Sequence, residues 1–131
     1  MTNVRQRTLA WVPAGAYMVL IWALSSMSHI LISFERVPFQ DKGVHFIEYG
    51  TLAVLLAHAV RGTWSHWRTL SVFGIAALGA TLWGLIDEIH QAFVPGRVAD
   101  AQDLLADALG SVLGSTVYLL LIKQQKRQRA S

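Results

Sequence analysis

Apolar residues are gathered in four long blocks that short polar connectors separate. The blocks run from about Leu9 to Ile32, from Val44 to Val60, from Leu70 to Ala92 and from Leu104 to Ile122. The hydrocarbon core of a bilayer is about 30 Å thick, and about 20 residues of helix cross it. Each block is long enough to do so once tilt is allowed for. The pattern predicts an all-α integral membrane bundle of four transmembrane helices, built as a single domain over residues 1–131.

Local signals refine the ends of these helices. The pattern places Pro13 in the first turn of the first helix, where its missing N–H costs little. Pro95 and Gly96 form a breaker pair that ends the third helix. Arg5 and Arg7 precede the first block, as in a cleaved signal sequence, but the apolar stretch is longer than a usual signal core. We therefore expect this block to be retained as a span.

The composition agrees with a membrane protein. Hydrophobic residues make up 53% of the chain and charged residues 15%, against about 25% charged in an average soluble domain. The absence of cysteine excludes disulfides, thiol catalysis and cysteine-based zinc sites. The net charge is +3, but the basic residues lie in tails and connectors and form no basic face. We expect contact with a lipid bilayer and no binding of nucleic acid.

Charge is distributed unevenly between the two sides of the predicted membrane. Eight basic residues lie in the two tails and the middle connector: Arg5, Arg7, Arg61, Arg68, Lys123, Lys126, Arg127 and Arg129. By the positive-inside rule this side is cytoplasmic, so both termini are predicted to be cytoplasmic. All eight carboxylates lie on the outer side: Glu35, Asp41, Glu48, Asp87, Glu88, Asp100, Asp103 and Asp107. We therefore expect a functional site, if there is one, at the outer side, where the carboxylates lie.

The second helix begins with polar residues on one face. Asp41, His45 and Glu48 are four and three residues apart, which places them on one side of a helix, and Tyr49 lies beside them. An N-cap at Asp41 and an aromatic belt at Tyr49 are ordinary features of a membrane interface. Glu48 is less ordinary, because a carboxylate near the centre of a membrane helix costs about 2.5–3.5 kcal/mol unless it is paired or hydrated.

The third and fourth helices carry acidic outer ends above seams of small residues. The third ends on Asp87, Glu88 and Gln91, and its seam is Gly74, Ala77, Thr81 and Gly84. The fourth has one seam of Asp100, Asp103, Asp107, Gly110 and Gly114. Small residues at this spacing allow helices to approach closely. We predict that helices two, three and four point their acidic ends into the bundle and form one polar pocket.

The excess of carboxylates in this predicted pocket has several interpretations. In a purely structural network, Arg97 and Lys42 neutralise some of the acids, and His45 and His90 donate hydrogen bonds. Buried charges destabilise a protein unless they are well paired. Carboxylates that outnumber cations therefore indicate protonated acids, a bound cation or a cationic ligand group. A divalent metal is one candidate cofactor, with candidate ligands His45, Glu48, Glu88 and His90.

Two motifs resemble those of the VanZ-like membrane family. They are Asp41-Lys42-x-x-His45-x-x-x-Tyr49 and Asp87-Glu88-x-x-Gln91-x-Phe93-x-Pro95-x-Arg97, and the match continues through Asp103, Gly110 and Gly114. The motifs cover helices two to four. One departure is Asp107, which stands where relatives tend to have Asn. The family is named for a protein that raises resistance to the glycopeptide teicoplanin, so the resemblance implies a role in the bacterial cell envelope, in the cytoplasmic (inner) membrane.

The first functional hypothesis is recognition or processing of an envelope lipid, or a related glycolipid or glycopeptide, at the outer leaflet. Arg97 is the expected partner of a phosphate or carboxylate, Glu88 the buried acid or base, and His45 the proton relay. The candidate catalytic residues are His45, Glu48, Asp87 and Glu88. The candidate ligand-binding residues are Asp41, Lys42, Tyr49, Gln91, Arg97, Asp103 and Asp107.

The alternative is a non-catalytic membrane protein that acts through a protein partner, with a structural polar cluster. Whether the protein is an enzyme stays open at this point. The glycine seams serve packing either within one chain or between chains, so a homodimer or another membrane protein partner is also open. Ion-coupled transport is unsupported, because the carboxylates lie at one end only.

Overall fold

The computed structural model describes residues 3–27 and 40–129. Within these residues the chain forms four α-helices and no strand: α1 (Val4–Ser25), α2 (Gln40–Thr63), α3 (Thr69–Gln91) and α4 (Ala101–Gln128). All four are long and apolar enough to cross a membrane. The predicted all-α bundle of four potential membrane spans is confirmed.

The first helix is displaced toward the N-terminus relative to the prediction. It begins at Val4 because Asn3 and Gln6 form a capping box, so Pro13 lies inside the helix and its predicted place in the first turn is wrong. The helix ends at Ser25, and the hydroxyl of the next residue, Ser26, donates to the Trp22 carbonyl at 2.7 Å. Serine hydroxyls compete for the carbonyls that continue a helix. Residues 28–32 of the predicted span lie outside the described residues.

The fourth helix is longer than predicted. It starts at Ala101, with Asp100 as its N-cap, and continues to Gln128 instead of stopping near Ile122. Its last turns are built from lysine, glutamine and arginine, which all favour helix. The basic tail therefore extends the helix beyond the apolar block. The second and third helices begin and end within four residues of the predicted positions.

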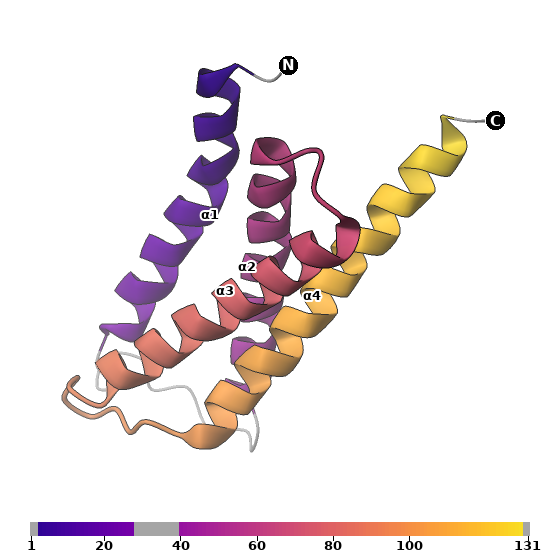
Figure 1. Ribbon diagram of the computed structural model, residues 1–131. Helices are drawn as coiled ribbons and strands as arrows, with labels where there is room; N and C mark the ends of the chain where they lie inside the picture. The colour runs from indigo at the N-terminus through magenta and orange to yellow at the C-terminus, as the bar shows by residue number, and fades with distance from the viewer. Residues whose placement is uncertain (1–2, 28–39, 130–131) are drawn as a thin grey trace.

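The two ends of the bundle differ in charge. The N-terminus, the connection from α2 to α3 and the C-terminus lie at the same end, which we call the basic end (Figure 1). At the opposite end, the acidic end, α1 and α3 finish and α2 and α4 begin. α2 contacts all three other helices, and its contact with α4 is the most extensive. Exposed leucine, isoleucine and valine side chains occur on all four helices, as expected of a lipid-facing surface.

Close packing of α2 against α4 depends on glycine. A Cβ on Gly110 would overlap the carbonyl oxygen of Phe46, and a Cβ on Gly114 would overlap the carbonyl oxygen of Gly50. The predicted glycine pair on α4 is therefore a true backbone contact. On α3, Gly84 is buried, but Gly74 is exposed and a Cβ there would have no neighbour within 4 Å, so Gly74 is not part of the predicted seam.

Candidate functional site

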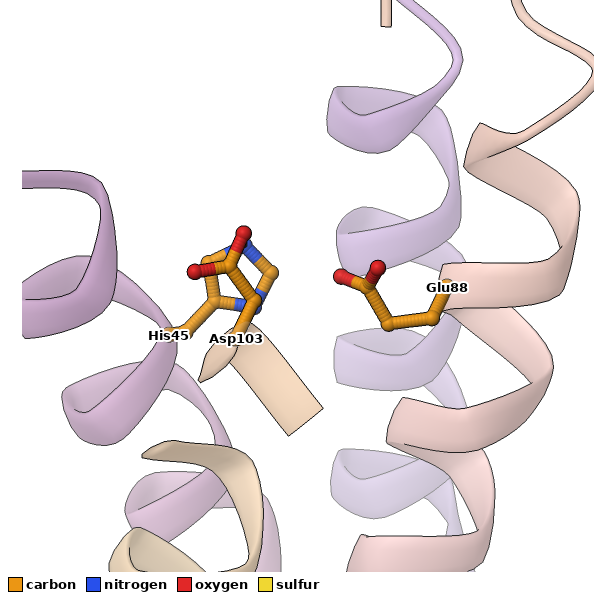
Figure 2. A group of neighbouring side chains, drawn as sticks. All are labelled: His45, Glu88 and Asp103. Carbon is orange, nitrogen blue, oxygen red and sulfur yellow. The ribbon is translucent and has the colours of Figure 1, made fainter. Parts of the chain in front are cut away.

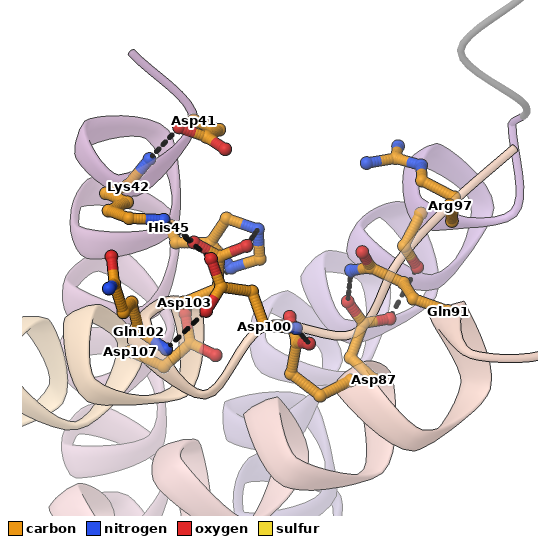
Figure 3. A network of polar contacts seen from close by, with 12 residues as sticks. Asp41, Lys42, His45, Asp87, Gln91, Arg97, Asp100, Gln102, Asp103 and Asp107 are labelled. Carbon is orange, nitrogen blue, oxygen red and sulfur yellow. Dashed lines mark hydrogen bonds and ion pairs between the residues drawn. The ribbon is translucent and has the colours of Figure 1, made fainter. Parts of the chain in front are cut away.

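The first turns of α2 and α4 and the last turns of α3 meet at the acidic end. Their polar side chains form a group that we call the polar cluster: Lys42, His45, Glu88, Asp100, Asp103 and Asp107. Figure 3 labels all of them except Glu88, which Figure 2 labels. Four of the six, His45, Glu88, Asp103 and Asp107, are buried. The prediction that acidic helix ends point inward is confirmed for Glu88 of α3 and for Asp103 and Asp107 of α4. On α2 it is wrong for Asp41, which is exposed, and Glu48 is half-buried.

Lys42 joins the start of α2 to the start of α4. Its Nζ lies 2.9 Å from Oδ2 of Asp100 and 3.0 Å from Oδ1 of Asp103. Asp100 also caps α4 by accepting the Gln102 amide at 2.8 Å. The amide hydrogen bond, followed by the contact with Lys42, holds the pKa of Asp100 below its ordinary value. Asp100 is thus an anion at neutral pH, at the exposed edge of the polar cluster.

His45 is oriented by a carboxylate on the facing helix. Its Nδ1 lies 3.0 Å from Oδ1 of Asp107, which is completely buried. Nδ1 donates in this bond, because a carboxylate oxygen accepts. Gly84 of α3 makes room for the acid, since a Cβ there would lie 2.5 Å from Oδ2 of Asp107. The other ring nitrogen, Nε2, lies 3.9 Å from Oδ2 of Asp103.

Glu88 reaches into the polar cluster from α3. Its Oε2 accepts the backbone amide of Asp100 at 2.9 Å, which connects the end of α3 to the cap of α4. Its Oε1 is buried and has no hydrogen-bond partner among the described residues, and the same holds for Oδ2 of Asp107. Buried acceptors are rarely left unpaired, because desolvation without a hydrogen bond costs about 1–3 kcal/mol. Each of these two oxygens is therefore open to a proton, a cation or a hydrogen-bond donor.

A second buried network lies beside the polar cluster. Ser25 of α1 donates to Oδ1 of Asp87, and Nε2 of Gln91 donates to Oδ2 of the same residue at 2.8 Å. Both oxygens of Asp87 are thus occupied by structural hydrogen bonds. Ser25 was not among the predicted site residues. The sequence could have indicated that Ser25 is buried, because its spacing from Ala14 and Ile21 places it on the same face of α1.

Arg97 is a helix cap in this structure. Its Nε donates to the carbonyl oxygen of Met27, which follows α1, at 3.2 Å, and its Nη2 donates to that of Leu24, in the last turn of α1, at 3.3 Å. These bonds tie the α3–α4 connection to the C-terminal end of α1, where basic side chains commonly contact the last carbonyls. The Leu24 carbonyl also accepts the Met27 amide at 3.1 Å. Figure 3 shows the guanidinium on the side of Gln91 and away from Lys42 and His45. Its predicted role as a ligand partner is separate from this capping and stays a prediction.

The remaining predicted residues surround the polar cluster. Asp41 is exposed and accepts the Lys42 amide at 3.0 Å, and Glu48 is half-buried. Tyr49 is completely buried, with its ring near parallel to His45 at 6.2 Å. His90 stacks on Trp22 at 3.9 Å, away from the polar cluster. Of the four predicted metal ligands, His45 and Glu88 lie together, joined by Asp103 in place of Glu48 and His90.

Two serines extend the buried polar stripe of α4 toward the middle of the bundle. Ser111 and Ser115 are completely buried, and neither hydroxyl has a hydrogen-bond partner in residues 3–27 and 40–129. The prediction omitted them. The signal was present, because Asp103, Asp107, Ser111 and Ser115 follow one another at intervals of four residues, which is one face of a helix.

The fold and the site define a multi-pass membrane protein with a buried acidic and histidine-containing cluster at one end. A family model, VanZ/LLP1, matches residues 1–122. The chain therefore belongs to the VanZ/LLP1 family, and the resemblance seen in its motifs is confirmed. Comparison with curated proteins and with solved structures gave no match.

Proposed function

We propose that this protein acts in the envelope of a bacterium, in the cytoplasmic (inner) membrane, with its basic end in the cytoplasm and its acidic end outside. The proposal is supported by the basic residues of the two tails and the α2–α3 connection, which meet at one end of the bundle. Family membership is consistent with an envelope role like that in teicoplanin resistance. The polar cluster would then face the outer leaflet.

At that leaflet, the protein recognises an envelope lipid. The observation that carries this proposal is an apolar groove of about 220 Å³ between α2 and α4. The groove is lined by residues that include Phe46, Gly50, Val54, Gly110, Leu113 and Val117. It begins at Phe46 and Gly110, which lie one residue after His45 and three residues after Asp107. An acyl chain in the groove would therefore place its head group beside the polar cluster.

The charge of the polar cluster limits the head group. Lys42 contacts Asp100 and Asp103, while Glu88 and Asp107 each retain an unpaired oxygen. A bare phosphate would meet several carboxylates, and like charges repel strongly where water is excluded. The arrangement favours a head group with a cationic part, or a phosphate that a bound cation bridges. Processing of the lipid would use His45 or Glu88, the two groups placed for proton transfer.

Native mass spectrometry of the detergent-purified protein tests lipid binding. The wild type is compared with Leu113→Trp, which fills the groove, and with Leu109→Trp, which adds the same side chain one turn away on the exposed surface of α4. We expect a tightly retained lipid on the wild type and on Leu109→Trp, and its loss from Leu113→Trp. Bare wild-type protein, or equal retention by all three proteins, would reject the proposal.

A second candidate is the non-catalytic role through a protein partner. It is favoured by the number of polar groups that already have structural partners, as in the pairs His45–Asp107 and Asp87–Gln91. It predicts that Glu88→Gln and Asp103→Asn keep full activity in cells at normal expression. Teicoplanin susceptibility of an expressing strain is the readout that the family suggests. Loss of the phenotype in these two variants would contradict the partner-only role.

A further inference from the structure

We infer that His45, Glu88 and Asp103 bind a divalent metal ion of the zinc type. The three side chains come from three different helices, and one ligand atom from each lies within 4.8 Å of the others. They are 8%, 5% and 7% exposed, respectively. Figure 2 shows Glu88 extending from α3 toward His45 and Asp103. Ligand atoms around a tetrahedral zinc ion, each about 2.1 Å from it, are about 3.4 Å apart, so side-chain movements of about 1 Å would close the site around the ion.

An unpaired oxygen points to a missing partner at this position. Oε1 of Glu88 is buried and accepts no hydrogen bond from any described residue, although Oε2 of the same carboxylate accepts the Asp100 amide. The backbone bond holds the carboxylate in place and leaves Oε1 available. Asp103 is held in a similar way, because Lys42 contacts its Oδ1 and leaves Oδ2 toward His45. Both carboxylates thus present one oxygen to the same space.

The orientation of His45 is that of a metal ligand. Nδ1 donates to Oδ1 of Asp107, which leaves Nε2 to offer its lone pair on the side of Asp103. A histidine that binds metal through one nitrogen usually donates from the other to a carboxylate or carbonyl, and this second bond holds the ring in position. Asp107 is therefore a positioning residue for the metal site and not a ligand.

The ligand set and the local charge indicate the kind of ion. One imidazole nitrogen and two carboxylate oxygens suit zinc and neighbouring transition metals better than magnesium or calcium, which prefer oxygen alone. A divalent ion would also offset the carboxylates that Lys42 does not contact. The inference does not depend on lipid binding, although a metal here would allow the polar cluster to accept a phosphate head group.

Metal analysis of the purified protein tests the inference. The full chain, prepared without a polyhistidine tag, is stripped with chelator, dialysed against micromolar Zn²⁺ and measured by mass spectrometry of elements. We expect one zinc per wild-type chain and at least tenfold weaker binding by Glu88→Gln and Asp103→Asn. Gln102→Ala is the control, because Gln102 is an exposed polar residue at the same end and was not predicted to bind a ligand, and it should bind like the wild type. Wild-type protein without stoichiometric zinc, or equal binding by Glu88→Gln, would overturn the inference.

A measurement on the wild type alone covers the case in which a variant fails to fold. X-ray absorption at the zinc edge should show one imidazole and a remainder of oxygen ligands. A first shell with no imidazole, or with two or more, would overturn the site as described. Zinc binding without lipid retention would support the metal site and reject the proposed lipid function. Lipid retention without zinc binding would support the lipid function and reject the metal site.

Discussion

His45 of α2 and Asp107 of α4 are joined by a buried hydrogen bond of 3.0 Å between Nδ1 and Oδ1, although 62 residues separate them in the chain. The bond lies about one turn from the close backbone contact of Gly110 with Phe46. Asp107 in turn fits against α3 because residue 84 is glycine. This one pair of side chains therefore depends on the packing of three helices, α2, α3 and α4, at the acidic end.

Two replacements of Asp107 distinguish the contribution of its hydrogen bond to stability from the contribution of its charge. Asp107→Asn keeps an oxygen that accepts from His45, so we expect a folded protein of equal or higher stability. Asp107→Leu leaves Nδ1 of His45 buried without an acceptor, which should destabilise the protein by about 1–3 kcal/mol. Thermal unfolding of both variants in detergent measures the difference. An Asn variant less stable than the Leu variant would show that the hydrogen bond to His45 does not stabilise the fold.

The glycines of α4 should tolerate no side chain. Gly110→Ala and Gly114→Ala force a Cβ against backbone carbonyls of α2, and we expect each to destabilise the bundle by about 1–3 kcal/mol. Gly74→Ala is the control, because its side chain would enter open space. That change should be neutral or stabilise by about 0.5–1 kcal/mol through helix propensity. Similar melting temperatures for all three variants would contradict the close contact of α2 and α4.

Arg97 should control the end of α1. Arg97→Ala removes the donors to the carbonyls of Leu24 and Met27, so amide hydrogen exchange should become faster in residues 22–27 and stay unchanged in α4. The expected loss is about 1 kcal/mol of local stability. Arg129→Ala, at the exposed end of α4, serves as the control. Unchanged exchange in α1 would mean that the Arg97 contacts do not hold this helix end.

Stability should depend on pH through Asp100. Its pKa lies below the ordinary value of 3.8, so its ionic contacts add stability above that pH and lose it as pH falls through the lowered pKa. Asp100→Asn retains a good N-cap but removes the charge. The wild type should therefore melt higher than this variant at pH 7, and the difference should shrink below pH 3.8. A difference that does not change between these pH values would exclude a contribution from ionised Asp100.

The absence of cysteine makes the proposed orientation simple to test. Val98→Cys places one thiol in the α3–α4 connection, and Ser65→Cys places one in the α2–α3 connection, with both positions exposed. In intact cells, a membrane-impermeant maleimide should label Val98→Cys and not Ser65→Cys. Both should react after the cells are opened. The reverse pattern would place the acidic end in the cytoplasm and remove the basis for an outer-leaflet lipid site.

The helices and the charge of each end were determined by the sequence itself. Block length, hydropathy and the segregation of charge are local properties of the chain, and they need no knowledge of how the helices pack. The same holds for the inward direction of Glu88, Asp103 and Asp107, because small-residue seams identify the packed face of α3 and α4. The errors near Pro13 and Ile122 arose at helix ends, where capping and propensity act beyond the apolar block.

Only the tertiary structure decided which polar side chains meet. From the sequence, the predicted metal ligands were His45, Glu48, Glu88 and His90. In the folded bundle, Asp103 lies beside His45 and Glu88, whereas His90 stacks on Trp22. A rotation of one helix by a single residue, about 100°, is enough to exchange such partners. That rotation is set by contacts between distant residues, above all the glycines of α4 against the backbone of α2. The sequence therefore determined that an acidic end exists, and helix packing decided which of its groups face one another.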